Sequence, residues 1–322
     1  MSKLLFQNTT IVGAGAIGRS WMFVFSRAGC NVKVYDIAQA PLDVCAKWLD
    51  SFLDEEVEGG YMTRDAANAC KARISYTTDL AEALKGSQYV QENTSERIEL
   101  KKKVYAQIDA AADPKTIIAS STSALNVDDF SGELPGAARC IMAHPFNPPY
   151  VLPAVEILGN RATSKKTIDD TIQFMKDIGQ KPVFMKKFVP GFIGNRLQAA
   201  ILRESFHLVE DGVADVADVE SLVYNALGLR WALFGNFGVN NTNADEGAAS
   251  YYKQFEGTYT ELSHDMRSDP PNFSPEMVAR IHKGISELEG GASPMELGRW
   301  RDKVIRRIRM LKEEIPHPGG KQ

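Results

Sequence analysis

Three glycines that stand between a predicted strand and a predicted helix constrain the fold of this chain more than any other feature. Residues 10–12 are a short β-branched run, and the apolar stretch that begins at Trp21 has the pattern of a helix. The glycines between them have the spacing Gly-x-Gly-x-x-Gly, at Gly13, Gly15 and Gly18. A second strand is predicted at 32–35, and Asp36 follows it. The chain therefore begins with a βαβ unit.

Strands and helices continue to alternate through the first half of the chain. Six more strands are predicted, at residues 73–76, 89–91, 116–119, 140–143, 155–158 and 182–185. Four more helices are predicted in the same part, at residues 41–58, 63–72, 96–112 and 165–178. Such alternation is typical of a parallel sheet that is covered by helices on both faces. We therefore predict an α/β fold with a Rossmann-type, doubly wound, mainly parallel sheet.

The pattern changes after Val189, where Pro190 and Gly191 interrupt it. Beyond this point we predict helices only, at residues 193–212, 216–227, 244–266, 274–288 and 294–314. A chain of 322 residues also exceeds what one hydrophobic core usually supports. We therefore predict two domains, residues 1–189 with the sheet and residues 190–322 as an all-helical domain.

Composition narrows the class of protein. Hydrophobic residues make up 44% of the chain and charged residues 24%, which is typical of globular rather than disordered proteins. The net charge of −4 argues against a nucleic acid partner. The four cysteines form no Cys-x-x-Cys pair, so we predict neither a metal site nor disulfides. Because we find no signal peptide and no apolar run of about 18 residues, we expect no membrane contact and a cytoplasmic location.

The glycine motif, in this position, predicts a dinucleotide-binding site. Gly13 allows the tight turn, Gly15 lets the backbone approach the pyrophosphate, and Gly18 permits close helix packing. Two backbone N–H groups at the helix N-terminus would face the same anion, those of Ala16 and Ile17. Asp36 can accept hydrogen bonds from ribose hydroxyls and would repel a 2′-phosphate, so we predict NAD rather than NADP. The alternative is a βαβ turn whose glycines serve packing alone.

Acid–base chemistry is expected from an imidazole in the loop 144–150, which is too rich in proline to form a helix. His144 begins this loop, and Glu156 lies in the next predicted strand. Histidine can give or take a proton near neutral pH, and a carboxylate behind it fixes its tautomer and charge. Glu156 would point back at the imidazole if its strand is antiparallel. The alternative is a purely structural His–Glu pair.

Two further polar residues are candidates for the same site. Ser123 follows the predicted strand at 116–119, and ligands bind at the carboxyl edge of a parallel sheet. Asn195 lies at the start of the first helix of the second domain and would face the cleft between the domains. The alternatives are a helix cap for Ser123 and a turn residue without ligand contact for Asn195.

With these residues in place, residues 11–311 resemble the 3-hydroxyacyl-CoA dehydrogenase superfamily, and most closely its λ-crystallin and L-gulonate 3-dehydrogenase branch. The resemblance implies a catalytic set of four residues, Ser123, His144, Glu156 and Asn195. It also implies that Glu96 and Lys101 are the nicotinamide-ribose and cofactor-contacting pair, and that Asn147 is a further cofactor contact. A homodimer through the helical domain is implied as well.

The residues after the histidine distinguish branches of this superfamily. The form His-Pro-x-Asn-Pro-x-Tyr-x-x-Pro, with Pro145, Tyr150 and Pro153, is similar to gulonate and carnitine dehydrogenases rather than to the CoA enzymes. The segment 43–73, whose counterpart in the CoA enzymes is lysine-rich, contains seven acidic and four basic residues here. Such a segment would repel the phosphates of CoA, so the sequence argues against acyl-CoA as the substrate.

Arg230 is the candidate for binding a substrate carboxylate, because a guanidinium can bind that anion with two hydrogen bonds. A buried structural ion pair is its alternative role. Residues 236–241 depart from the pattern of the branch. We predict NAD-dependent oxidation of the 3-hydroxyl of a small hydroxy acid such as L-gulonate. L-carnitine and short-chain 3-hydroxyacyl-CoA are alternative substrates, and a crystallin-like structural or regulatory dinucleotide binder is the alternative of a different class.

Overall fold

The computed structural model describes residues 4–319, and the chain divides into two compact units. Unit 1 extends to Gly194 and unit 2 begins at Asn195. The boundary that the sequence placed near residue 189 falls inside unit 1. None of the helices in the described residues is long and apolar enough to cross a membrane.

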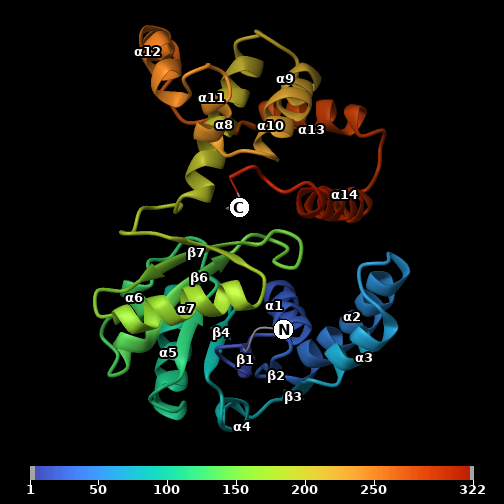
Figure 1. Ribbon diagram of the computed structural model, residues 1–322, viewed down its shortest axis with the longest axis vertical. Helices are drawn as coiled ribbons and strands as arrows, with labels where there is room; N and C mark the ends of the chain where they lie inside the picture. Colours follow the sequence, from blue (N-terminus) through green and yellow to red (C-terminus); the bar gives the residue numbers. More distant parts are fainter. Residues whose placement is uncertain (1–3, 320–322) are drawn as a thin grey trace. The chain divides into compact units, whose positions relative to one another are not determined.

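Unit 1 is built on one eight-stranded sheet, whose strand order is β3-β2-β1-β4-β5-β6-β7-β8 (Figure 1). The strands are β1 Asn8–Val12, β2 Asn31–Tyr35, β3 Ile74–Thr77, β4 Tyr89–Glu92, β5 Ile117–Ser120, β6 Cys140–Pro145, β7 Ala154–Gly159 and β8 Lys181–Phe184. Six of the seven neighbouring pairs are parallel, and β6 pairs with β7 antiparallel. The predicted doubly wound, mainly parallel sheet is confirmed.

Helices cover both faces of this sheet. They are α1 Ala16–Ala28, α2 Gln39–Glu58, α3 Arg64–Lys71, α4 Leu80–Leu84, α5 Ile98–Ala111, α6 Asp128–Ser131 and α7 Lys165–Asp177. One apolar cluster contains residues of α1, α2, α3 and α7, and the other contains residues of α4, α5 and α6. Successive strand residues enter different clusters, as Ile117 and Ile118 of β5 do, because side chains alternate across a strand. The strands are therefore apolar on both faces.

Local sequence accounts for the element boundaries. Helix α1 ends at Gly29, which has a φ of 107°, a left-handed conformation that glycine adopts without strain. Helix α4 was not predicted, although Asp79 caps it by accepting hydrogen bonds from the N–H groups of Ala81 and Glu82. Its five residues are too short to show a helical period.

Unit 2 is all-helical in its described residues, as predicted. Its helices are α8 Gly194–Glu210, α9 Val216–Leu222, α10 Gly228–Trp231, α11 Asn236–Asn241, α12 Ala248–Asp265, α13 Pro275–Leu288 and α14 Pro294–Glu314, and Val223–Leu227 forms a π-helical turn. Helix α14 begins with a capping box between Ser293 and Glu296. The buried apolar cluster of unit 2 is small and contains Phe206, Val209, Val216, Val219 and Met277.

Candidate active site

The glycine turn has the shape that a bound pyrophosphate requires. Gly13 has a φ of 93°, and its N–H donates to the carbonyl of Tyr35 over 2.8 Å. A Cβ on Gly18 would lie 1.8 Å from the carbonyl oxygen of Gly13, so only glycine fits there. A Cβ on Gly15 would meet nothing within 4 Å, which leaves the backbone open to a ligand. Ala16 and Ile17 then begin α1.

Asp36 lies directly after β2 and beside the same turn. Its Oδ2 accepts a hydrogen bond from the N–H of Ala14 over 2.9 Å, so the carboxylate is oriented by the glycine turn itself. The side chain remains half-buried. The position suits a carboxylate that binds ribose hydroxyls next to a pyrophosphate. The residues present therefore fit NAD.

The antiparallel pairing of β6 and β7 places His144 directly opposite Glu156. The imidazole Nδ1 lies 2.8 Å from Oε2 of Glu156, and both side chains are buried. The other carboxylate oxygen accepts the backbone N–H groups of Ile193 and Gly194, over 2.8 and 2.9 Å. The antiparallel geometry on which the sequence argument depended is present.

Hydrogen bonds lower the pKa of Glu156 and thereby fix the tautomer of a neutral His144. Burial raises the pKa of Glu156, but hydrogen bonds from His144, Gly194 and Ile193 outweigh burial and hold the pKa below its usual value. An ionised carboxylate only accepts hydrogen bonds, so the proton of a neutral His144 is on Nδ1. The other ring nitrogen, Nε2, is then an acceptor and can take a proton from a substrate.

Aromatic rings enclose the imidazole. The ring centroids of Phe146 and Phe192 lie 5.6 and 5.5 Å from that of His144. Phe192 is fully buried and has a φ of 52°, the one positive value among the described residues that are not glycine. A Cβ on Gly194 would lie 2.2 Å from Cζ of Phe146. The segment 192–194 is therefore fitted closely around the histidine, and its backbone carries strain there.

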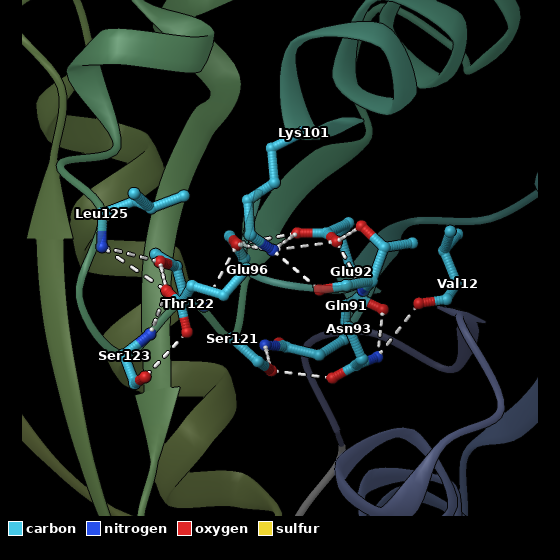
Figure 2. A network of polar contacts seen from close by, with 12 residues as sticks. Val12, Gln91, Glu92, Asn93, Glu96, Lys101, Ser121, Thr122, Ser123 and Leu125 are labelled. Atoms are coloured by element: carbon cyan, nitrogen blue, oxygen red, sulfur yellow. Dashed lines mark hydrogen bonds and ion pairs between the residues drawn. The ribbon is translucent and has the colours of Figure 1, made fainter. Parts of the chain in front are cut away.

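Glu96 binds the turn that contains Ser123. Its carboxylate accepts the N–H groups of Ser123 and Ala124 over 2.8 and 3.0 Å, the Ser123 hydroxyl over 2.7 Å, and the hydroxyl of Thr122 (Figure 2). Burial raises the pKa of Glu96, but these hydrogen bonds outweigh it and lower the pKa to about 2. The structure thus brings together two residues that the sequence assigned to cofactor and substrate.

A second polar network fixes the chain between β5 and this turn. The Ser121 hydroxyl accepts hydrogen bonds from Trp21 Nε1 over 3.1 Å and from Gln91 Nε2 over 2.8 Å, and it donates to Asn93 Oδ1 over 2.7 Å. Gln91 also donates to the carbonyl of Ala143, over 3.1 Å. These hydrogen bonds link α1 and β6 to the carboxyl ends of β4 and β5. Figure 2 shows the part of this network that contains Gln91, Asn93 and Ser121.

The ammonium of Lys101 is buried and paired within the protein. The side chain is 1% exposed, and its Nζ lies 2.8 and 3.0 Å from the two carboxylate oxygens of Glu92. Protein oxygens therefore surround the ammonium of Lys101, and its predicted contact with the cofactor stays a prediction. Glu92 was not among the predicted site residues, although an acid at the end of a buried strand is the same signal that pointed to Asp36.

The exposed predicted site residues include Asn147, Asn195 and Arg230. Asn147 is exposed in the loop after β6. Asn195, also exposed, is the second residue of α8 and follows directly after the two N–H donors to Glu156. Arg230 is exposed in α10, and its Nε donates to the carbonyl of Ala226 over 3.4 Å. Within residues 4–319 it has no ion pair with a carboxylate, so the alternative of a buried ion pair is wrong. The ligand roles of these three residues remain predictions.

Comparison with known proteins identifies the family. Residues 8–188 match the NAD binding domain of 3-hydroxyacyl-CoA dehydrogenase, and residues 191–291 match its C-terminal domain. The chain belongs to the 3-hydroxyacyl-CoA dehydrogenase family and is an NAD-dependent dehydrogenase. The predicted superfamily and the predicted cofactor are confirmed.

Individual relatives span nearly the whole chain. Lambda-crystallin of Oryctolagus cuniculus is 33% identical over 309 residues, which are 95% of this chain and 96% of the relative. L-carnitine dehydrogenase of Bacillus cereus is 33% identical over 321 residues, 98% of this chain and 96% of the relative. The solved structure of 5-formyl-3-hydroxy-2-methylpyridine 4-carboxylic acid 5-dehydrogenase has a TM-score of 0.77 at 24% identity and covers 96% of this chain and 98% of its own, which shows the fold.

Proposed function

We propose that the protein oxidises the 3-hydroxyl group of a small, free hydroxy acid such as L-gulonate. The observation that carries this proposal is the contact of 2.8 Å between His144 and Glu156, in which Glu156 is also held by two backbone N–H groups. A base whose orientation is fixed in this way can remove a hydroxyl proton at neutral pH.

In this mechanism His144 Nε2 takes the hydroxyl proton while the neighbouring C–H bond loses a hydride. Glu156 stabilises the imidazolium that forms, because its ionised carboxylate lies against Nδ1. Ser123 and Asn195 are proposed to donate hydrogen bonds to the oxygen as it becomes a carbonyl. NAD, when bound, supplies the hydride acceptor, and the glycine turn with Asp36 would hold it.

The charges on α2, α3 and the turn that follows support a small acid over acyl-CoA. Two of the four basic residues there are paired with acids, Arg64 with Asp54 over 2.6 Å and Lys71 with Asp50 over 2.5 Å. Arg73 donates to backbone carbonyls. The segment therefore offers little positive charge to a CoA phosphate. Arg230 remains our candidate for the substrate carboxylate.

L-carnitine is the second candidate substrate. The support for it is the 33% identity to L-carnitine dehydrogenase over 98% of this chain. Carnitine is also a free 3-hydroxy acid, so the same base and the same cofactor would serve. Short-chain 3-hydroxyacyl-CoA is the third candidate, and a crystallin-like structural role is the alternative without turnover.

A substrate screen tests the proposal. NADH formation is measured with L-gulonate, L-carnitine, 3-hydroxybutyrate and 3-hydroxybutyryl-CoA. We expect turnover of a free acid, a loss of about 1,000-fold in kcat with His144→Asn, and unchanged NAD binding. His282→Asn is the matched control, because His282 is exposed on α13. Turnover of the CoA ester alone, or full activity of His144→Asn, would overturn the assignment.

We also propose that the protein is a homodimer through unit 2. Helices α12 and α14 bury none of their residues, and large apolar side chains of unit 2 are exposed. They include Leu222, Leu229, Phe237, Leu262, Trp300 and Leu311. Large apolar side chains that are exposed on one unit are what a protein interface would bury. Sedimentation at micromolar concentration tests this proposal, and a monomer would contradict it.

A reducing, cytoplasmic location is proposed from the cysteines. All four are buried as free thiols. Burial raises the pKa of Cys30, Cys45 and Cys140 to about 12, so these thiols are inert at neutral pH. Fractionation of cells that express the protein tests the location.

A further inference from the structure

Glu92 and Lys101 form a fully buried ion pair under the candidate site. Their side chains are 0% and 1% exposed. Glu92 is the last residue of β4, and the strand register places it beside Val12 of β1 and Ser120 of β5. The pair therefore lies where the carboxyl ends of three central strands meet.

The two carboxylate oxygens of Glu92 bind different loops of the site, and Lys101 contacts both loops. Oε1 of Glu92 accepts the N–H of Thr94 over 2.6 Å and also the Thr94 hydroxyl, and Lys101 Nζ donates to the Thr94 carbonyl over 3.2 Å. These contacts fix the loop that leads to Glu96. Oε2 of Glu92 accepts the Ser120 hydroxyl over 2.7 Å, and Ser120 Oγ in turn accepts the N–H of Thr122 over 3.2 Å. These contacts fix the turn that contains Ser123.

Neither charge is explained by local structure. Lys101 lies in the first turns of α5, near the positive end of the helix dipole, where a cation is disfavoured. Burying two charges costs more than burying apolar side chains of the same volume, so ion pairs of this kind are weak contributors to stability. The pair is therefore suited to fixing two loops rather than to stabilising the core.

We propose that Glu92 and Lys101 are positioning residues that hold the two loops of the site, with Glu96 on one and Ser123 on the other, in a single arrangement (Figure 2). The inference deepens the proposed function and rests on it for the ligand roles of Glu96 and Ser123. Its physical content, a shared anchor for residues 94–96 and 121–125, does not depend on the substrate.

The test compares Lys101→Met with the double variant Glu92→Gln/Lys101→Met. We expect Lys101→Met to lower the Tm strongly, because it leaves Glu92 buried without its cation, and the double variant to recover most of the Tm. In the double variant we still expect faster hydrogen exchange in residues 121–125, about tenfold weaker NAD binding and about 100-fold lower kcat. Binding of ADP, which lacks the nicotinamide half, should be unchanged.

Lys102→Met is the matched control, because Lys102 is the next residue of α5 and is half exposed, with a contact of 3.4 Å to Glu99. We expect it to match the wild type in every measurement. Wild-type exchange and NAD affinity in the double variant would overturn the proposal, and so would parallel losses of NAD and ADP binding. If the wild type oxidises none of the hydroxy acids, the proposed function fails. Hydrogen exchange and NAD binding then still test the role of Glu92 and Lys101.

Discussion

The two units bury different kinds of side chain. Unit 1 has two large apolar clusters on the faces of its sheet and buries charged groups beside them, each with a partner, such as Lys101 and Glu156. Unit 2 has a buried apolar cluster of five residues, and its longest helices bury none. The acid–base pair His144 and Glu156 is therefore oriented by contacts within unit 1, whereas unit 2 leaves large apolar side chains exposed.

The two buried histidines show the same difference. His144 in unit 1 has an ionised partner at 2.8 Å. His207 in unit 2 is 2% exposed, yet neither ring nitrogen has a hydrogen-bond partner, and its Nε2 lies 3.8 Å from the carboxylate of Asp269. A base needs a fixed tautomer, and within the described residues only the first of these two histidines has one.

A substitution of Glu156 tests the difference between the two units most directly. Glu156→Gln removes the ionised partner of His144 while it keeps the shape of the side chain. We expect kcat to fall by about 10³ to 10⁴, because the imidazolium loses its counter-charge and Nδ1 loses its fixed proton. Stopped-flow measurement of NADH formation checks this. The control Glu99→Gln, an exposed residue of α5, should be silent, and a loss below tenfold for Glu156→Gln would contradict the mechanism.

Truncation of one buried methionine in each unit tests how completely each core is packed. Met22 is fully buried and contacts Cys45 and Tyr76 through its sulfur, whereas Met277 is 8% exposed at the edge of the small cluster. We expect Met22→Ala to cost about 4 kcal/mol and Met277→Ala about 2 kcal/mol. Urea unfolding, followed by hydrogen exchange in each unit, measures both. Equal costs would show that the core of unit 2 is as complete as that of unit 1.

Two glycine substitutions in unit 1 distinguish a role in packing from a role in ligand binding. Gly18→Ala forces a Cβ against the carbonyl of Gly13 and should cost about 1–3 kcal/mol of stability. Gly15→Ala meets no protein atom within 4 Å, so we expect unchanged stability and about tenfold weaker NAD binding, because the backbone can no longer approach the pyrophosphate. Thermal unfolding and NAD titration of both variants check this. Strong NAD binding by Gly15→Ala would remove that glycine from the cofactor site.

Sequence reasoning reached the sheet and the His–Glu pair because both depend on local pattern. Most strands of unit 1 contain short β-branched or apolar runs, and the spacing of His144 and Glu156 across one loop allowed an antiparallel return. It did not find Glu92, whose partner is nine residues away around a loop and a helix turn. Nor did it find α10 and α11, because short helices between 228 and 241 have no sustained period.

Lys101 shows why a residue's presence does not fix its role. The pattern that named Lys101 is correct in sequence, yet burial directs its ammonium to Glu92 and to Thr94. Burial of a single side chain depends on long-range packing, which no local spacing reports. The same limit applies to Arg230, whose exposure in α10 could not be read from the residues around it.

The smallest effect that we expect is on the free energy of unfolding. It concerns two carboxylates with a similar pKa. The pKa of Glu96 in unit 1 is held at about 2 by the hydrogen bonds of the 122–125 turn, against burial that raises it. The pKa of Asp269 in unit 2 is also about 2, and the hydrogen bond from Arg267 is the main cause. Because both are depressed in the folded state, each contributes stability above the unfolded pKa and loses it as pH falls toward 2.

Salt affects the stability contributed by these two carboxylates differently. Both side chains are exposed, but salt screens the ion pair of Asp269 with Arg267, whereas Glu96 binds backbone N–H groups that salt does not remove. We expect Glu96→Gln to cost less than about 1 kcal/mol at pH 6, with the difference from wild type vanishing as pH falls from 4.5 toward 2. Asp269→Asn should show a difference that disappears in about 1 M salt. Urea unfolding across pH and salt measures both, and a salt-sensitive Glu96 would place its stabilising contacts in solvent rather than in the turn that contains Ser123.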